Sequence, residues 1–185
     1  SGEAIVGNYT NAQLTVIPSM IVSVDEFFIR YPMGEVLSKK TGIKMAEKYY
    51  GYNPYVNYDG AKSKPIKAFF NPLNVSGRLP AMERVVDIKS KGKYKIYPFS
   101  VVAKKGVIND DFNDIKVVVF HQKGTISILD NADIKKSKDI GTVTVFSRIL
   151  DGRVLQFIKN NGVFEDTETH SKWDIMGYCY EGRLK

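Results

Sequence analysis

The chain has 185 residues, of which 43% are hydrophobic, and this is enough for one domain with a packed core and too many for a disordered segment. Its net charge of +7 comes mostly from lysines that are spread over several predicted turns and strand ends, so we expect no nucleic-acid partner. The single cysteine excludes an internal disulfide, and no apolar stretch approaches the roughly 20 residues of a membrane span.

The clearest helix signal lies near the N-terminus. Ser23 and Glu26 form a capping box at its start, and Pro32 follows at its end. Between them, apolar residues recur at helical spacing, namely Val24, Phe27, Phe28 and Tyr31. The pattern predicts a helix near residues 23–31 whose apolar face belongs to the core, and a second short helical piece at 43–50.

From residue 51 to residue 80 the composition shifts to Tyr, Asn, Pro, Gly and Lys. This composition predicts a long irregular excursion with at most one short strand. Ordered loops of that length are uncommon and are often functional. We therefore expect residues 51–80 to cover or to form a functional surface of the domain.

After Arg84 the sequence turns to short β-rich runs. They cover residues 84–88, 94–97, 115–121, 125–129, 142–150, 154–159, 163–166, 172–175 and 178–180. Asp151-Gly152 is a strong hairpin signal, and Ser90 to Gly92 is a weaker one. We predict a mainly β fold, an antiparallel sandwich or a partly closed barrel, with the one helix near the N-terminus.

The excursion also holds the best candidate for a ligand-binding surface. Five tyrosines occur between Tyr49 and Tyr58, with asparagine and aspartate among them. Aromatic faces and amides suit a glycan or a peptide, so the candidate ligand-binding residues are Tyr52, Asn53, Tyr55 and Asp59. The alternative is that the tyrosines simply pack an irregular segment onto the domain.

The sequence contains no nucleotide-binding glycine motif, no nucleophile elbow and no zinc-binding motif, so no cofactor and no metal are predicted. The weak catalytic candidates are His121, at the end of the most apolar strand, and the pair Asn109 and Asp110, which could orient it as a general base. In the alternative interpretation His121 bonds to a loop and Asn109-Asp110 form an Asx turn before Ile115.

Three carboxylates gather at Glu165, Asp166 and Glu168, next to Trp173. They could bind a hard cation such as calcium. The run Asp166 to Ser171 also reads as a polar reversal between two strands, with Trp173 as a core anchor, and we favour this interpretation.

Several stretches in a fixed order resemble the second half of an uncharacterised bacterial and archaeal family, domain of unknown function 3179. They are Gly2 to Gly7, Tyr31-Pro32 with Thr41-Gly42, Tyr52 to Asp59, Arg78 to Pro80 with Arg84 to Val86, Lys93 to Leu129, and Asp151 to Arg153 with Trp173. No reaction is established for the family, so the resemblance implies architecture and origin and leaves the chemistry open.

The resemblance implies a tandem duplication, of which this chain is the C-terminal half. The first half of such proteins carries a Cys-Pro-Leu-Cys-Gly segment, where this chain has Phe120 to Gly124 without cysteine, so no redox or metal role carries over. Gly2-x4-Gly7 echoes Gly177-x4-Gly182, and the first residue is not methionine, so we expect a truncated or processed product whose partner is the missing N-terminal half. Family members often look exported, which implies an extracytoplasmic location.

We therefore expect a non-catalytic binding or structural module of an exported protein. The alternative is a hydrolase-type enzyme that uses His121 with Asp110 in a cleft at the strand ends.

Overall fold

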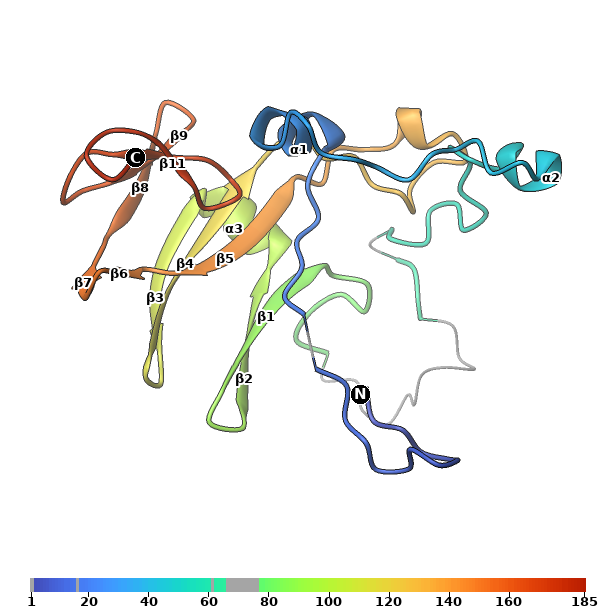
Figure 1. Cartoon of the computed structure of the whole chain (residues 1–185), viewed down its shortest axis with the longest axis horizontal. Helices are drawn as coiled ribbons and strands as arrows, with labels where there is room; N and C mark the ends of the chain where they lie inside the picture. The colour runs from blue at the N-terminus through green and yellow to red at the C-terminus, as the bar shows by residue number, and fades with distance from the viewer. Residues whose placement is uncertain (1, 16, 61, 66–76) are drawn as a thin grey trace.

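The computed structural model describes residues 2–15, 17–60, 62–65 and 77–185, and it shows a mainly β chain with antiparallel strands and short helices (Figure 1). The helices are α1 (Val24–Arg30), α2 (Lys44–Glu47) and α3 (Phe99–Lys105), with a 3-10 turn at η3 (Ile134–Lys136). The strands are β1 (Val85–Ser90), β2 (Lys93–Pro98), β3 (Val107–Phe112), β4 (Ile115–Gln122), β5 (Thr142–Ser147), β6 (Ile149–Leu150), β7 (Arg153–Val154), β8 (Phe157–Asn160), β9 (Val163–Asp166), β10 (Lys172–Trp173) and β11 (Cys179–Glu181). In this described part of the chain, no helix has both the length and the apolar character needed to cross a membrane.

A three-stranded antiparallel sheet, β3-β4-β5, lies left of the centre of Figure 1. β4 is its middle strand, and Val118 of β4 lies opposite both Asn109 of β3 and Phe146 of β5. Successive side chains of β4 point to opposite faces, and those of residues 117–121 are all buried. Burial on both faces explains why the sequence shows a continuous apolar run here instead of an alternating pattern.

One face of the central sheet is covered by the β1–β2 hairpin and by α3. Val119 packs there against Tyr97 of β2 and Val102 of α3. β2 runs directly into the helix, because Pro98 is both the last residue of the strand and the N-cap of α3. Gly106, at φ 75°, ends the helix and leads into β3.

The other face packs against a C-terminal four-stranded sheet, β11-β10-β9-β8. Phe120 stacks on Phe164 with the ring centroids 4.3 Å apart, and it meets Phe157 edge-on at 5.3 Å. Asn109 joins the two sheets, because its Nδ2 donates to the Phe157 carbonyl at 2.7 Å and its Oδ1 accepts from the Phe157 N–H at 2.9 Å. The described strands therefore form layers, and none of the described sheets closes into a barrel.

Both predicted hairpins are confirmed. Asp151 and Gly152 connect β6 to β7 with φ values of 48° and 75°. Lys91 and Gly92 connect β1 to β2 with φ values of 49° and 73°. Two consecutive residues at positive φ make the turn whose twist matches that of antiparallel strands, which is why these dipeptides predict hairpins well.

Three elements differ from the prediction. Residues 99–105, where the sequence analysis predicts no helix, are the helix α3. Asn109 and Asp110 lie in the middle of β3 instead of in an Asx turn, and the chain reverses later, where Asn113 has φ 54°. Residues 125–129 form no strand, and only Ile126 makes an isolated bridge, with Asp139.

The predicted helix near residue 23 exists, but its face is not core. Ser23 Oγ accepts a hydrogen bond from the Glu26 N–H at 3.2 Å, as the capping box requires. No residue of α1 is fully buried, and Val24 is exposed. Beyond the end of the helix, the Tyr31 hydroxyl hydrogen-bonds to that of Tyr178 at 2.9 Å, so this segment lies on the surface of the C-terminal region. α2 covers only residues 44–47 of the predicted 43–50.

The N-terminal arm, residues 2–21 without residue 16, folds back on itself at its start. The Ala4 N–H donates to the Ala12 carbonyl at 2.9 Å, and the Leu14 N–H donates to the Gly2 carbonyl at 2.9 Å. Most apolar side chains of the arm point into solvent, including Ile5 and Ile17.

The excursion follows the loop between β4 and β5. The Asn53 N–H donates to the Ala132 carbonyl at 2.9 Å, and the Asn57 N–H donates to the Asp130 carbonyl at 2.7 Å. Its described part contains no helix or strand, as predicted, and makes one isolated bridge between Tyr52 and Asp133. Residues 61 and 66–76 of the predicted excursion lie outside the described residues.

Candidate functional site

The residues that follow α2 and the start of the excursion form a pocket of about 640 Å³, which we call the tyrosine pocket. It is lined by Lys48, Tyr49, Tyr52, Asn53 and Pro54. Asn53 is only 6% exposed, and its Oδ1 accepts from the Tyr55 N–H at 2.8 Å. Among the described residues, the Nδ2 of Asn53 has no hydrogen-bond partner. A buried amide donor without a partner is costly, and an acceptor on a ligand would satisfy it.

Backbone pairing with the loop between β4 and β5 holds this pocket in place. Gly51 accepts from the Ile134 N–H at 3.1 Å, directly before the Tyr52–Asp133 bridge and the Asn53 N–H bond. Tyr55 does not line the pocket, and its ring packs against Tyr58 with the centroids 6.2 Å apart. Of the four predicted ligand-binding residues, the structure therefore brings Tyr52 and Asn53 together.

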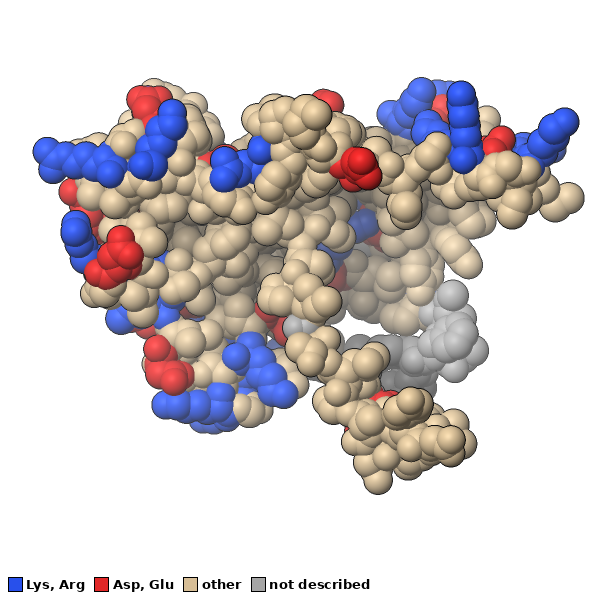
Figure 2. Space-filling view, viewed as in Figure 1, with Lys and Arg blue, Asp and Glu red and all other residues tan. Residues whose placement is uncertain are grey.

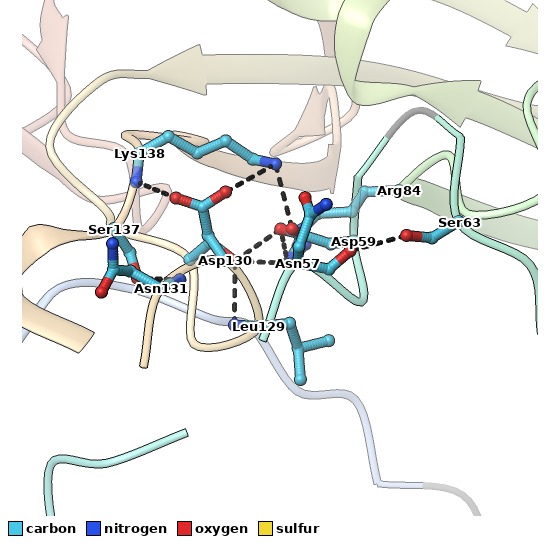
Figure 3. Close-up of polar contacts among 10 residues, drawn as sticks. Asn57, Asp59, Ser63, Arg84, Leu129, Asp130, Asn131, Ser137 and Lys138 are labelled. Carbon is cyan, nitrogen blue, oxygen red and sulfur yellow. Dashed lines mark hydrogen bonds and ion pairs between the residues drawn. The ribbon is translucent and has the colours of Figure 1, made fainter. Parts of the chain in front are cut away.

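Asp59 lies in a different place, at the centre of a polar cluster (Figure 3). Its Oδ2 accepts from Arg84 at 2.8 Å and from the Ser127 hydroxyl at 2.5 Å, and its Oδ1 accepts from the Lys138 ammonium at 2.9 Å. Lys138 also pairs with Asp130 at 3.2 Å. We call these five residues the Asp59 cluster.

The Asp59 carboxylate is almost completely enclosed, with its side chain 4% exposed. Burial raises its pKa, but the hydrogen bonds from Ser127 and Lys138 and the charges of Lys138 and Arg84 outweigh burial and hold the pKa below its ordinary value. Burial lowers the pKa of Lys138, but its hydrogen bonds to Asp59 and Asp130 and the charges of these two carboxylates raise it above its ordinary value. Both groups are therefore charged at neutral pH.

The Asp59 cluster borders a second pocket, of about 290 Å³, beside the start of α3. Its wall includes Glu83, whose Oε1 accepts from the Ser100 N–H at 3.1 Å at the first turn of the helix. Both oxygens of Asp59 are already bound, so the cluster is arranged to join the excursion to β1 and to the loop before β5. Sequence reasoning missed Ser127 and Lys138, although Asp59 and Arg84 both belong to the stretches that carry the family resemblance.

The structure separates the catalytic candidates. Asp110 lies opposite Val117 of β4, and His121 lies four residues further along that strand, a distance of about 14 Å at the rise of a β-strand. Asn109 and Asp110 are neighbours in β3, so their side chains point to opposite faces of the sheet. Among the described contacts, none joins His121 to either residue.

Each of these candidates has other partners. Asp110 accepts from the Tyr97 hydroxyl at 2.9 Å and pairs with Lys95. Burial raises the pKa of Asp110, but the hydrogen bonds from Lys95 and Tyr97 lower it below its ordinary value. His121 is 6% exposed, and its burial together with the nearby charge of Lys159 lowers its pKa. Asn109 bonds to Phe157, as described above.

The three carboxylates near Trp173 point to three different protein groups. Asp166, fully buried, accepts from the Trp173 Nε1–H at 3.0 Å and from Thr169. Glu165 contacts His170 at 2.6 Å, and Glu168 accepts from the Gln156 N–H at 2.9 Å. This arrangement confirms the predicted polar reversal, with Trp173 packed on the hydrophobic core between the central sheet and the C-terminal sheet. Among the described residues, no group of three metal-binding side chains is close enough together to hold an ion.

The fold and these pockets define a layered, mainly β domain whose polar clusters are largely satisfied within the protein. The family model described as "Protein of unknown function (DUF3179)" matches residues 1–185, so the chain belongs to this family. No curated protein and no solved structure matches the chain.

Proposed function

We propose that this domain is a non-catalytic binding module and that the tyrosine pocket receives a glycan or a peptide. The observation that carries the proposal is the buried Asn53, a lining residue of the pocket whose Nδ2 has no partner among the described residues. Tyr49 and Tyr52 are exposed beside it and offer flat apolar faces. A sugar ring or a peptide unit could stack on these faces and place an oxygen against the Asn53 amide.

Arrays of glycans and peptides test the proposal, and two variants test the pocket. Tyr52→Ala removes a stacking face, whereas Asn53→Asp keeps the acceptor for the Tyr55 N–H and removes the free donor. We expect each variant to weaken binding of any array ligand by about tenfold, since a lost contact of this kind costs on the order of 1–2 kcal/mol.

Tyr94→Ala is a matched control. Tyr94 is 63% exposed and Tyr52 is 64% exposed, but Tyr94 lies on the β1–β2 hairpin. The control should leave binding unchanged. Equal loss in both tyrosine variants, or full affinity in Asn53→Asp, would show that the ligand binds elsewhere.

We also propose that the N-terminal arm and the α1–α2 segment pack against the other half of a duplicated protein. Isolated apolar side chains are normal on a surface, but here many follow one another, and residues 2–21 carry a single charged residue, Glu3, so the arm is almost entirely tan in Figure 2. The most exposed of them are Ile5, Val6, Ile17, Ile29, Met33 and Leu37. The family resemblance, which implies a duplicated protein, is the reason for naming the other half as the partner of this surface. The same resemblance supports an extracytoplasmic location.

Copurification of this chain with a separately produced N-terminal half tests that proposal. Met33→Glu and Leu37→Glu, at fully exposed positions, should weaken the complex without unfolding the domain. A complex that tolerates both charges would place the contact on another surface.

A further inference from the structure

A third pocket lies where β4, α3 and β8 end close together, and we call it the lysine pocket. It has a volume of about 520 Å³. Its wall carries His121 from β4 and four lysines, which are Lys104, Lys105, Lys123 and Lys159. The lysines come from three separate segments, so the tertiary fold gathers them, and no single run of sequence does.

The positive charge of the lysine pocket is not balanced by the protein. Elsewhere lysines pair with carboxylates, as Lys138 does with Asp59 and Lys172 with Glu181. Within the described residues, none of the four pocket lysines forms an ion pair. The acidic group that acts on His121 in the pocket wall is Asp139, whose oxygens accept from the backbone N–H groups of Gly124 and Gly141.

Lys159 shows the imbalance most directly. Its ammonium donates to the His121 carbonyl at 2.6 Å and lies 4.7 Å from the centre of the Phe164 ring. Burial and the charge of Lys123 lower its pKa. A flexible lysine could reach bulk water, yet this one is held beside another cation with an uncharged oxygen as its acceptor.

We propose that the lysine pocket binds a tetrahedral oxyanion, phosphate or sulfate, either free or as the terminal group of a larger ligand. Lysine ammonium groups are effective point-charge partners for such anions, and a concave site lined by one sign of charge concentrates the opposite ion. The pocket is larger than a phosphate ion and has room for a small molecule that carries one. This inference is independent of the tyrosine pocket, which shares no lining residue with it.

Amide NMR spectra of the whole chain, recorded at constant ionic strength, test this proposal. Sodium phosphate, sodium sulfate and glucose 6-phosphate are titrated against sodium chloride, and the amides of Gly106 and Gly162, both on the pocket wall, are followed. We expect saturable shifts with the oxyanions and none with chloride. Tighter binding of glucose 6-phosphate than of phosphate would indicate the terminal group of a larger ligand, and equal binding would indicate the free ion.

Lys123→Gln supplies the specific variant, because Lys123 is exposed and its loss should not disturb folding. We expect the affinity for phosphate to fall at least about threefold, the effect of losing one partly screened charge. Lys91→Gln is the matched control, with the same loss of charge at the tip of the β1–β2 hairpin, and it should bind as the parent does. Equal losses in the two variants, or shifts that never saturate, would reduce the effect to general charge screening and overturn the proposal.

The pKa of His121 gives a second test, because phosphate should change it only if the anion binds in the lysine pocket. The charged groups that act on its ring are Lys159 and Lys123, which oppose protonation, and Asp139, which favours it, with Lys104 and Lys105 on the same wall. A bound oxyanion would stabilise the imidazolium, so the pKa of His121 should rise in phosphate relative to chloride. An unchanged or lower pKa would contradict the site.

Discussion

Asp59→Asn tests whether the Asp59 cluster holds the excursion on the domain. The carboxylate accepts three side-chain hydrogen bonds and is 4% exposed, and its partners Arg84 and Lys138 are more accessible. Hydrogen bonds to charged groups contribute roughly 1.5–3 kcal/mol each, and solvent screens the share of Lys138. Asparagine preserves the shape and one acceptor oxygen, so we expect the free energy of unfolding to fall by about 2–3 kcal/mol at pH 7.

Urea denaturation measured by circular dichroism gives this difference directly. For a chain of this size, Tm should fall by about 2–4 °C for each kcal/mol lost. Asp133→Asn is the control, because Asp133 forms an exposed pair with Lys136 at 3.5 Å. Asp133 lies in the loop between β4 and β5, which also carries Ser127 and Lys138 of the Asp59 cluster. Its cost should stay within about 0.5 kcal/mol, which is typical of surface pairs.

The effect of Asp59→Asn should also depend on pH. The pKa of Asp59 is lower in the folded state than in the unfolded state, so the stability it contributes is fully present above about pH 4 and is lost as the pH falls through the folded-state pKa. The gap between parent and variant should therefore narrow in acid. A gap below 0.5 kcal/mol at pH 7, or one that widens as the pH falls, would refute this account of the cluster.

Two further changes probe the layers. Phe120→Ala removes a fully buried ring that packs against three other aromatic rings, so the free energy of unfolding in chemical denaturation should fall by about 3–5 kcal/mol. Phe28→Ala, at a half-buried site, should cost clearly less, and similar costs would mean that Phe120 is not central to the core between the central and C-terminal sheets. Asn109→Ala removes both hydrogen bonds to the Phe157 backbone, so the Phe157 amide should exchange its hydrogen faster and stability should fall by roughly 2 kcal/mol; unchanged exchange would show that packing alone joins β3 to β8.

The elements that sequence reasoning found have local causes. β4 was recognisable because its residues are buried on both faces, and the Asp151-Gly152 hairpin because both residues accept positive φ. β3 was missed because Asn109, Asp110 and Asp111 interrupt its apolar pattern. Asn109 bonds to Phe157 and Asp111 pairs with Arg148, and because these partners lie far away in sequence, the contacts become visible only in the folded chain.

The candidate sites also divide into one built from neighbouring residues and one built from residues far apart in sequence. The tyrosines and Asn53 form a pocket from neighbouring residues, and composition alone pointed to them. In the Asp59 cluster, the side-chain hydrogen bonds of Asp59 join residues that are 25 to 79 positions apart, and no spacing rule connects them. For α1, helical periodicity correctly predicted a helix, but periodicity cannot say whether an apolar face meets a core or remains exposed.

The apolar run of β4 would be prone to self-association if either of its covering layers came away. Six residues, Ile115 to Phe120, combine high β-propensity with one charge and no proline or glycine, which is the composition of segments that stack into fibrils. α3 with the β1–β2 hairpin shields one side of this strand and the C-terminal sheet shields the other. Heat or acid that loosens either layer should therefore drive the chain into aggregates before it reaches a fully unfolded, soluble state.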